Sequence, residues 1–490
     1  MPGHAAGAAD DRAPKKPPRR LPVAELQRWY GEALELKGDE ALARKVQDAE
    51  QLVDELFDTP DAGARRPLLD RVLALALPPE ALRAAVRCGH VPLAEAPAAG
   101  HAQGQADVPG FPKKQTAVTA RIPRGYTHER LWPLIVDLHG ANGNGADYIR
   151  HWDSGAKPAA LEQFLIVAPT AQAGHGWGPA SFGRAQVEAA VRWAERQYRV
   201  DSRRVYLSGC SMGGIGAKTN AVASPERFAA VVSRSGPPAQ PTELPLYRNL
   251  HALPLWVLAG DQDTLVPLAH LQREQAGLAQ LKIPARMEIL PGRGHELFQE
   301  RNAEILEFFL KQPRESCPAR LDFVSLADAP VARHYWVEVT RFVTAGNTPI
   351  TSRVLDNSRI NDPLIQKMQA AKTLAEHLAL AQEAQRAGLI LEERRVWAQP
   401  RSVSVSADRA SNTIIVEQAQ FVAELRVLLD DDLLDLSRPV TIKQGANVLA
   451  TRTVTRAPRF LLDDALRSGR RDGTYWGEIT VTVRCTGAER

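Results

Sequence analysis

The sequence contains little cysteine and no long hydrophobic run. Its four cysteines, Cys88, Cys210, Cys317 and Cys485, form neither a CxxC pair nor a metal-ligand spacing, and we expect Cys210 to be a small buried residue. A disulfide between two of the other three stays an open alternative. No run of about 18 apolar residues exists, so no membrane span is expected. The start lacks the apolar core of a secretory signal, which favours a cytoplasmic protein, or a secreted or periplasmic one if the start has been trimmed.

An excess of charge of one sign is also missing. The chain carries 61 Lys and Arg against 57 Asp and Glu, a net charge of +4. The clearest basic cluster, Lys15 to Arg20, lies within residues 1–21, whose composition predicts a flexible tail. Without a broad basic face, nucleic acid is not an expected partner. The sequence does not indicate an oligomeric state.

The chain of 490 residues is too long for one hydrophobic core, so several domains are expected. Apolar residues at three- and four-residue steps predict a helical region over 22–95. Residues 96–113 are rich in Ala, Gly and Pro, which predicts a linker. The remaining two regions, 114–312 and 316–490, differ from each other in their apolar patterns.

Region 114–312 alternates short apolar strands with amphipathic helices. The predicted strands are 116–122, 134–138, 164–168, 205–208, 229–233, 255–259 and 287–290. The predicted helices lie near 183–198, 212–222, 268–280 and 298–311. Continuous apolar strands between helices indicate an α/β domain, in which helices cover both faces of a mostly parallel sheet.

Region 316–490 predicts a second, mainly antiparallel β domain. Its strand-like segments are 335–343, 402–405, 412–416, 423–429, 440–443 and 478–483, several with period two. A stretch rich in Ala, Gln, Glu and Leu predicts a helical insertion over 363–388. The acidic run Asp430 to Asp432 could suggest a calcium site, but a solvated turn between two strands is the expected use.

The clearest motif is Gly209-Cys210-Ser211-Met212-Gly213, which lies between an apolar strand and a helix rich in small residues. This is the strand–turn–helix context of a G-x-S-x-G elbow. Glycines at both ends remove side chains that would collide in so tight a turn. The motif predicts that Ser211 is a nucleophile exposed at the carboxyl edge of the sheet.

An acid and a histidine follow the serine in the expected order. Asp261 and Asp263 follow the strand ending at Ala259, and His295 lies in the glycine-containing loop after the last strand. Asp263 is the predicted orienting acid and Asp261 the alternative; either could instead cap the following helix. His295 would accept the proton of Ser211, and Asp263 would stabilise the resulting imidazolium.

Acyl transfer also requires hydrogen-bond donors where negative charge develops. The predicted donors are two backbone N–H groups, those of Met212 and Ala141. Ala141 lies in the loop that begins His139-Gly140, where we expect Gly140 to let the chain turn towards the site. An ordinary tight turn is the alternative for this loop.

Four segments together resemble the α/β-hydrolase esterases: PLIVDLHGANGNG, YRVDSRRVYLSGCSMGG, LAGDQDTLVP and GRGHE. The subgroup of feruloyl esterases, polyhydroxybutyrate depolymerases and prolyl-oligopeptidase-like hydrolases is the most similar, over about 114–312. The resemblance implies a small-molecule or polymer-linked ester substrate and no metal or organic cofactor. It also implies that Gly140 and the loop residues His175, Trp177 and Phe182 face the substrate, with a plain surface loop as the alternative for 171–182.

Three other functions are weighed against an esterase. Asp261-Gln262-Asp263 resembles a D-x-D-x-T phosphatase motif, but Leu265 stands where that motif has Thr. A prolyl-oligopeptidase-like peptidase would share the triad but normally carries a β-propeller. An inactive scaffold could bind a partner through Trp336, Trp397 or Trp476, although core packing is the expected use of these residues.

Overall fold

A computed structural model describes most of the chain as two compact units, residues 1–96 and 97–490. The described residues are 23–30, 34–59, 61–87, 97–153, 159–172, 176–178, 181–237, 243–327, 332–355, 359, 362–370 and 374–486. The predicted tail, 1–21, therefore lies outside the described residues.

The described part of the first unit is helical, as predicted. It contains α1 (Val23–Tyr30), α2 (Glu40–Asp58), α3 (Ala62–Ala74) and α4 (Pro79–Arg87). Asp39 and Asp61 cap α2 and α3, each accepting a backbone N–H of the first turn. A small core around Leu26, Val46 and Ala85 holds the unit together.

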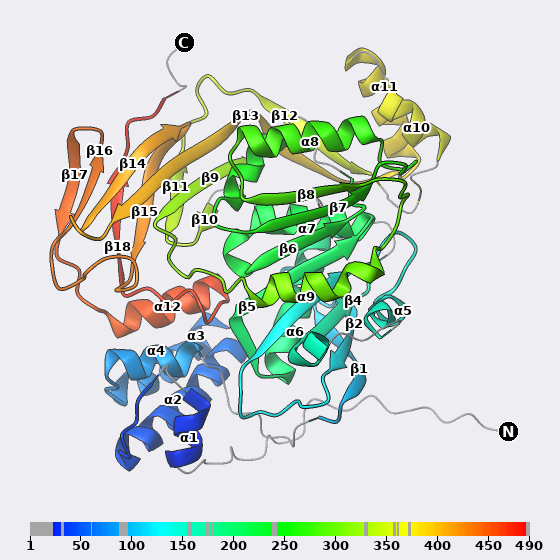
Figure 1. Cartoon of the computed structure of the whole chain (residues 1–490). Helices are drawn as coiled ribbons and strands as arrows, with labels where there is room; N and C mark the ends of the chain where they lie inside the picture. The colour runs from blue at the N-terminus through cyan, green and yellow to red at the C-terminus, as the bar shows by residue number, and fades with distance from the viewer. Residues whose placement is uncertain are drawn as a thin grey trace. The chain divides into compact units, whose positions relative to one another are not determined.

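The second unit is built on a large, mostly parallel sheet (Figure 1). Its strands in spatial order are β1 (Gly100–Asp107), β2 (Gln115–Ile122), β4 (Leu165–Pro169), β3 (Trp132–Leu138), β5 (Val200–Cys210), β6 (Ala230–Arg234), β7 (Leu255–Gly260) and β8 (Ala285–Leu290). The pairings from β4 to β8 are parallel, and those of β1 with β2 and β2 with β4 are antiparallel. The predicted mostly parallel sheet is confirmed.

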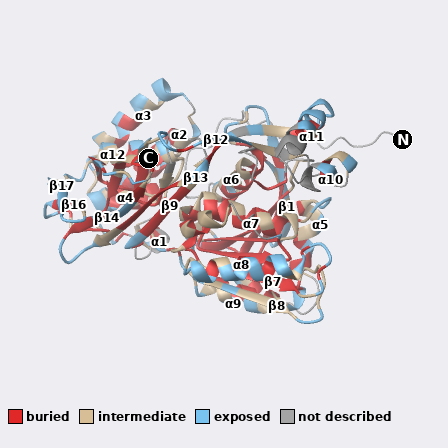
Figure 2. Cartoon of the chain, turned by 90° about the horizontal axis from the view of Figure 1, so that it is seen from above, coloured by how far each residue is buried: buried red, intermediate tan, exposed pale blue. Residues whose placement is uncertain are grey.

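Helices cover both faces of this sheet. The residues of α6 (Ser181–Gln197) and α7 (Met212–Ala223) contribute to the core on one face, and α9 (Asn302–Leu310) to the core on the other. Helix α8 (Leu268–Gln280) follows β7 and presents many exposed residues, whereas the strands are coloured as buried in Figure 2. The strand interiors are apolar on both sides, as a sheet between two helical layers requires.

The linker predicted over 96–113 instead contains the edge strand β1. Composition misled the prediction, because β1 is mostly exposed and has small or polar residues in place of a regular apolar alternation. A Cβ at Gly104 would lie 2.7 Å from the indole ring of Trp193, so glycine is required for α6 to pack against this strand. Strand β1 therefore depends on pairing with β2 and on packing against α6, and the apolar periodicity of its own residues does not predict it.

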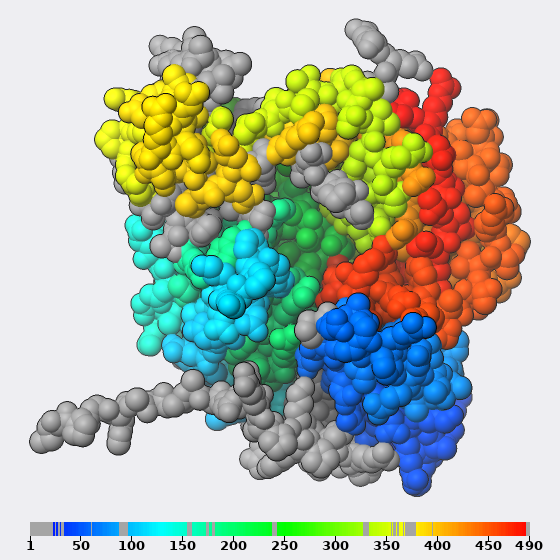
Figure 3. All heavy atoms as spheres, turned by 180° about the vertical axis from the view of Figure 1, so that it is seen from behind, coloured from blue at the N-terminus to red at the C-terminus, as the bar shows by residue number. Residues whose placement is uncertain are grey.

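The C-terminal β domain contains two further sheets. One is β10 (Ala332–His334), β11 (Val337–Phe342), β15 (Val422–Leu429) and β18 (Gly477–Thr482); the other is β12 (Pro349–Leu355), β13 (Ile390–Asp408), β14 (Thr413–Gln420), β16 (Val440–Gln444) and β17 (Asn447–Arg452), with β9 (Arg320–Ala327) beside β13. All pairings are antiparallel except that of β14 with β16. The helical insertion forms α10 (Pro363–Ala370) and α11 (Leu374–Arg386), a yellow lobe at the end of the β12–β13 arm in Figure 3. Helix α12 (Pro458–Ser468) was not predicted.

The three tryptophans considered for a binding role are buried in this domain. Trp336, Trp397 and Trp476 are at most 3% exposed. The acidic run is a turn, in which the backbone N–H of Asp432 donates to Asp430 and Arg456 pairs with Asp431. Core packing of the tryptophans, the expected use, agrees with this burial.

Candidate active site

Ser211 occupies the turn between β5 and α7 in a conformation that few non-glycine residues adopt. Its φ and ψ are 55° and −118°, and its backbone N–H donates to the Arg234 carbonyl at 2.9 Å. A Cβ at Gly213 would lie 1.9 Å from the Leu138 carbonyl oxygen, so only glycine lets α7 begin against the end of β3. Such positive-φ strain held by close backbone packing is typical of functional sites.

Asp263 and His295 are hydrogen-bonded to each other. The His295 Nδ1 lies 2.8 Å from Asp263 Oδ2. The other carboxylate oxygen of Asp263 accepts the backbone N–H groups of Leu265 and Val266 at 2.8 and 2.9 Å. The Asp263 side chain is fully buried while that of His295 is 21% exposed, so the imidazole presents its Nε2 side towards the surface of the domain.

Asp261 has a different partner. Its Oδ1 accepts the backbone N–H of Gly292 at 2.7 Å, which ties the end of β7 to the loop that carries His295. Gly292 has a φ of +71°, in the region that favours glycine, whereas Gly294 is not in the positive-φ region. The geometry thus brings Asp263, and not Asp261, to the histidine.

The neighbours of Ser211 and His295 hold their two loops together. The Cys210 Sγ lies 3.7 Å from the Glu296 carbonyl oxygen. The Ser235 hydroxyl, at the end of β6, donates to the same carbonyl at 2.8 Å and accepts the Glu296 N–H at 3.1 Å. Burial raises the pKa of Cys210 to about 11, so its thiol stays protonated and is a poor nucleophile at neutral pH.

The loop after β3 is supported by a neutral histidine. His139 Nδ1 lies 2.6 Å from the Gly140 carbonyl oxygen, and its Nε2 accepts the Ala171 N–H at 3.0 Å. Burial lowers the pKa of His139 below its usual value, which agrees with an unprotonated Nε2 acceptor. The Trp177 indole N–H donates to the His139 carbonyl at 2.8 Å.

Gly140 lies next to the serine but does not make the turn. The residue of this loop with positive φ is Asn142, at 58°. A Cβ at Gly140 would lie 3.5 Å from the Ser211 Cβ, in ordinary van der Waals contact. The missing side chain therefore leaves space beside the nucleophile. Ala141 follows as an exposed residue, and Met212, the first residue of α7, is half-buried.

The residues predicted to face substrate are placed differently. Trp177 is fully buried and Phe182 is 5% exposed, both within the core beneath the sheet face that α6 and α7 cover. A Cβ at Gly216 would lie 2.3 Å from the Trp177 Cβ, so this tryptophan packs directly on α7. Trp177 supports the His139 loop from behind, which corrects the expectation of substrate contact. His175 lies outside the described residues.

A buried polar cluster at the ends of three strands was not predicted. We define this strand-end cluster as Asp137, His151, Ser208, Arg234 and Asn302, all at most 6% exposed. Burial alone would raise the pKa of Asp137, but the charge of Arg234 and hydrogen bonds from His151 and Trp152 outweigh burial and lower it. A sequence signal existed, because Asp137 and Arg234 are opposite charges inside otherwise apolar strands.

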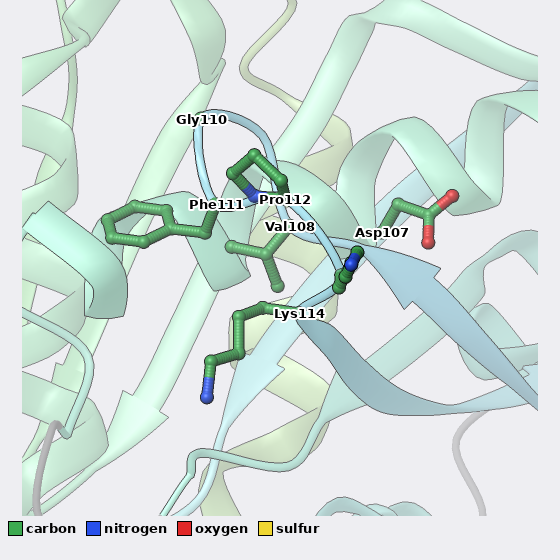
Figure 4. A pocket seen from close by; sticks show the side chains of 7 residues that line it. Asp107, Val108, Gly110, Phe111, Pro112 and Lys114 are labelled. Carbon is green, nitrogen blue, oxygen red and sulfur yellow. The ribbon is translucent and has the colours of Figure 1, made fainter.

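Two surface hollows among the described residues are lined by segments other than those of the predicted site. One, of about 460 Å³, is lined by the β1–β2 turn from Asp107 to Lys114 (Figure 4). Another, of about 390 Å³, is lined by residues between Arg452 and Thr480 of the C-terminal domain. None of the predicted site residues lines either hollow. Among the described residues, no helix is long and apolar enough to cross a membrane.

The strand order, the strained serine turn and the acid–histidine pair define residues 97–312 as an α/β-hydrolase domain. Residues 184–312 match the family described as Phospholipase/Carboxylesterase.

The chain is also similar to individual proteins over part of its length. NocK of Nocardia uniformis subsp. tsuyamanensis, named as an esterase, is 31% identical over 159 residues, 29% of this chain and 44% of that protein. Feruloyl esterase B of Neurospora crassa is 32% identical over 116 residues, 21% of this chain and 38% of that protein. The chain thus spans less than half the length of these relatives. A solved thermostable esterase is 21% identical, with a TM-score of 0.37, over 44% of this chain and 63% of that one.

Proposed function

We propose that this protein is a serine hydrolase that cleaves carboxylic esters through an acyl-enzyme. Ser211 attacks the ester carbonyl while His295 takes its proton. The alcohol leaves with that proton, and water, activated by the same imidazole, then frees the acid. The backbone N–H groups of Met212 and Ala141 would stabilise the negative charge on the carbonyl oxygen.

The hydrogen bond between Asp263 and His295 carries this proposal. One carboxylate oxygen of Asp263 accepts two backbone N–H groups and the other lies against His295 Nδ1, an arrangement that would orient the imidazole. The same arrangement disfavours the phosphatase alternative, in which Asp261 would be the nucleophile: its carboxylate is engaged by the Gly292 N–H. Met212 is the first residue of α7, so its backbone N–H has no acceptor within the helix and would be available to an anion.

Esters are favoured over peptides as substrates for two reasons. An activated serine attacks esters more readily than amides, and both curated relatives bear esterase names. The space beside Ser211 at Gly140 would admit the acyl part of the substrate. One relative is named a feruloyl esterase, so aromatic acyl esters form a natural test class.

Hydrolysis of p-nitrophenyl acetate by the full chain tests the proposal. Ser211→Ala and His295→Ala should each lower kcat by at least about 10³-fold without changing the melting temperature by more than a few degrees. Ser437→Ala, at an exposed serine of the C-terminal domain, is the serine control and should retain a burst of p-nitrophenol. Unchanged turnover in Ser211→Ala would exclude the serine mechanism. Methyl ferulate and a matched amide would then rank the substrate classes.

A further inference from the structure

The strand-end cluster joins three adjacent strands at the edge of the sheet that carries Ser211. The Arg234 Nη2 donates to Asp137 Oδ1 at 3.1 Å and to the Ser208 hydroxyl at 2.8 Å, and its Nη1 donates to Asn302 Oδ1 at 3.2 Å. Asp137 belongs to β3, Ser208 to β5 and Arg234 to β6, which are neighbours in the sheet. One guanidinium thus fixes the ends of three strands.

Each of these strands leads into a predicted part of the site. Asp137 lies four residues before Ala141, and Ser208 lies four residues before Met212. The Arg234 carbonyl accepts the Ser211 N–H at 2.9 Å. Both proposed oxyanion donors and the nucleophile are therefore attached, through a few residues of backbone, to the same buried ion pair.

Asp137 is itself held from the other side. His151 Nε2 and the Trp152 indole N–H lie 2.7 and 2.8 Å from its Oδ2, so the carboxylate has partners on both oxygens. Asp137 and Arg234 are both fully buried. A buried pair seldom improves stability over a well-packed apolar pair, so its position at the site requires a different explanation.

We propose that Arg234 is a positioning residue. Its guanidinium fixes the ends of β3, β5 and β6 so that the Ala141 and Met212 N–H groups face the oxyanion formed at Ser211. This inference rests on the proposed function. A planar guanidinium can serve three acceptors in fixed directions, whereas the single ammonium of lysine on a flexible stem cannot hold them in the same geometry. Small displacements of such donors reduce the rate strongly.

Arg227 provides a matched control near the other end of the same strand. It precedes β6 in the short helix η4 (Pro225–Arg227), is 4% exposed, and pairs with Glu195 at 2.8 Å and Glu188 at 3.2 Å. Each arginine makes three side-chain hydrogen bonds through a guanidinium on a residue at most 4% exposed, and replacement by lysine removes this set. The two substitutions should therefore destabilise the fold similarly but differ in their effect on turnover.

The test compares Arg234→Lys with Arg227→Lys in steady-state ester hydrolysis and in thermal unfolding. We expect Arg234→Lys to lower kcat at least about tenfold with KM within about threefold, because oxyanion contacts form only in the transition state. Arg227→Lys should keep kcat within about twofold at a similar loss of melting temperature.

Ser208→Ala, which removes one acceptor of Arg234, keeps the proposal testable if Arg234→Lys does not fold. It should lower kcat by a few-fold with KM unchanged. Equal kcat values in Arg234→Lys and Arg227→Lys would overturn the positioning role. If Arg234→Lys does not fold, an unchanged kcat in Ser208→Ala would overturn it instead. Because Ser211→Ala tests hydrolysis separately, that result would leave the proposed function standing.

Discussion

At the scale of single residues, the backbone around Asp263 decides which oxygen faces His295. One carboxylate oxygen accepts two backbone N–H groups and the other faces the imidazole. In Asp263→Asn the amide oxygen would keep the backbone donors, so the amide NH₂ would turn towards His295 Nδ1. That arrangement favours the tautomer with its proton on Nε2, which cannot accept the Ser211 proton, and kcat should fall by about 10³- to 10⁴-fold.

Asp261→Asn is the control for this change. Its carboxylate accepts only the Gly292 N–H among the hydrogen bonds described, and an amide oxygen can do the same. We expect kcat within about threefold of the unsubstituted protein, measured with the same p-nitrophenyl ester. A larger loss in Asp261→Asn than in Asp263→Asn would reverse the assignment of the two aspartates.

The order of the motifs predicts Ser211, His295 and Asp263, but that order by itself does not separate Asp263 from Asp261. Both carboxylates follow the same strand within three residues, and the order of motifs allows either one. What separates them is the path of the 263–266 turn, which is set by tertiary contacts. The prediction that Trp177 contacts substrate was wrong for a related reason. The sequence around a loop tryptophan does not show whether its side chain faces solvent or packs behind the loop.

At the scale of elements, the end of β7 and the His295 loop meet at a glycine. A Cβ at Gly260 would lie 2.1 Å from the Arg293 carbonyl oxygen, and the Gln262 N–H donates to that same oxygen at 2.9 Å. Gly260→Ala should therefore displace the loop carrying His295 and lower kcat at least about tenfold.

Gly294→Ala is the matched control in the same loop. A Cβ there would have no neighbour within 4 Å, and the residue is not in the positive-φ region. Activity and melting temperature should stay close to those of the unsubstituted protein. Full activity in Gly260→Ala would show that the loop tolerates the displacement and that its packing on β7 does not set the position of His295.

Periodicity predicted the elements of the hydrolase core because those strands are continuous apolar runs. It missed β1, β9, β10, β12 and β17, of which β1 and β17 have no fully buried face. Such edge strands depend on backbone pairing with a neighbour more than on their own side chains. The parallel pairing of β14 with β16 was equally hidden, since register between distant segments is a property of the assembled sheet.

At the scale of the whole second unit, the C-terminal domain packs on the edge of the large sheet opposite to Ser211. The Tyr335 hydroxyl donates to the Pro225 carbonyl at 3.2 Å, just before β6. Asn249, in the short helix η5 (Leu244–Leu250) before β7, exchanges hydrogen bonds with Val324 of β9 at 2.7 and 3.0 Å. Substitutions at this interface should therefore lower the melting temperature more than they lower kcat.

His251 is a titratable group at that interface, so we expect the stability of the interface to depend on pH. Its Nδ1 contacts Asp322 and its Nε2 lies 3.0 Å from the Leu281 carbonyl oxygen, so both nitrogens face acceptors and the imidazolium is favoured. The hydrogen bond with Asp322 raises the pKa of His251 above 6.5. Burial alone would raise the pKa of Asp322, but hydrogen bonds from His251 and Ser404 and the charge of Arg248 lower it to about 2.

The sign of the pH effect follows from the raised pKa of His251. Its contribution to stability is complete below about pH 6.5 and is lost as the pH rises through the raised value. His251→Ala should therefore lower the melting temperature more at pH 6 than at pH 9, while Asp322 stays ionised at both. The exposed His270→Ala is the control and should show no such difference. An equal loss at both pH values would mean that His251 packs as a neutral ring and that the interface carries no titrating charge.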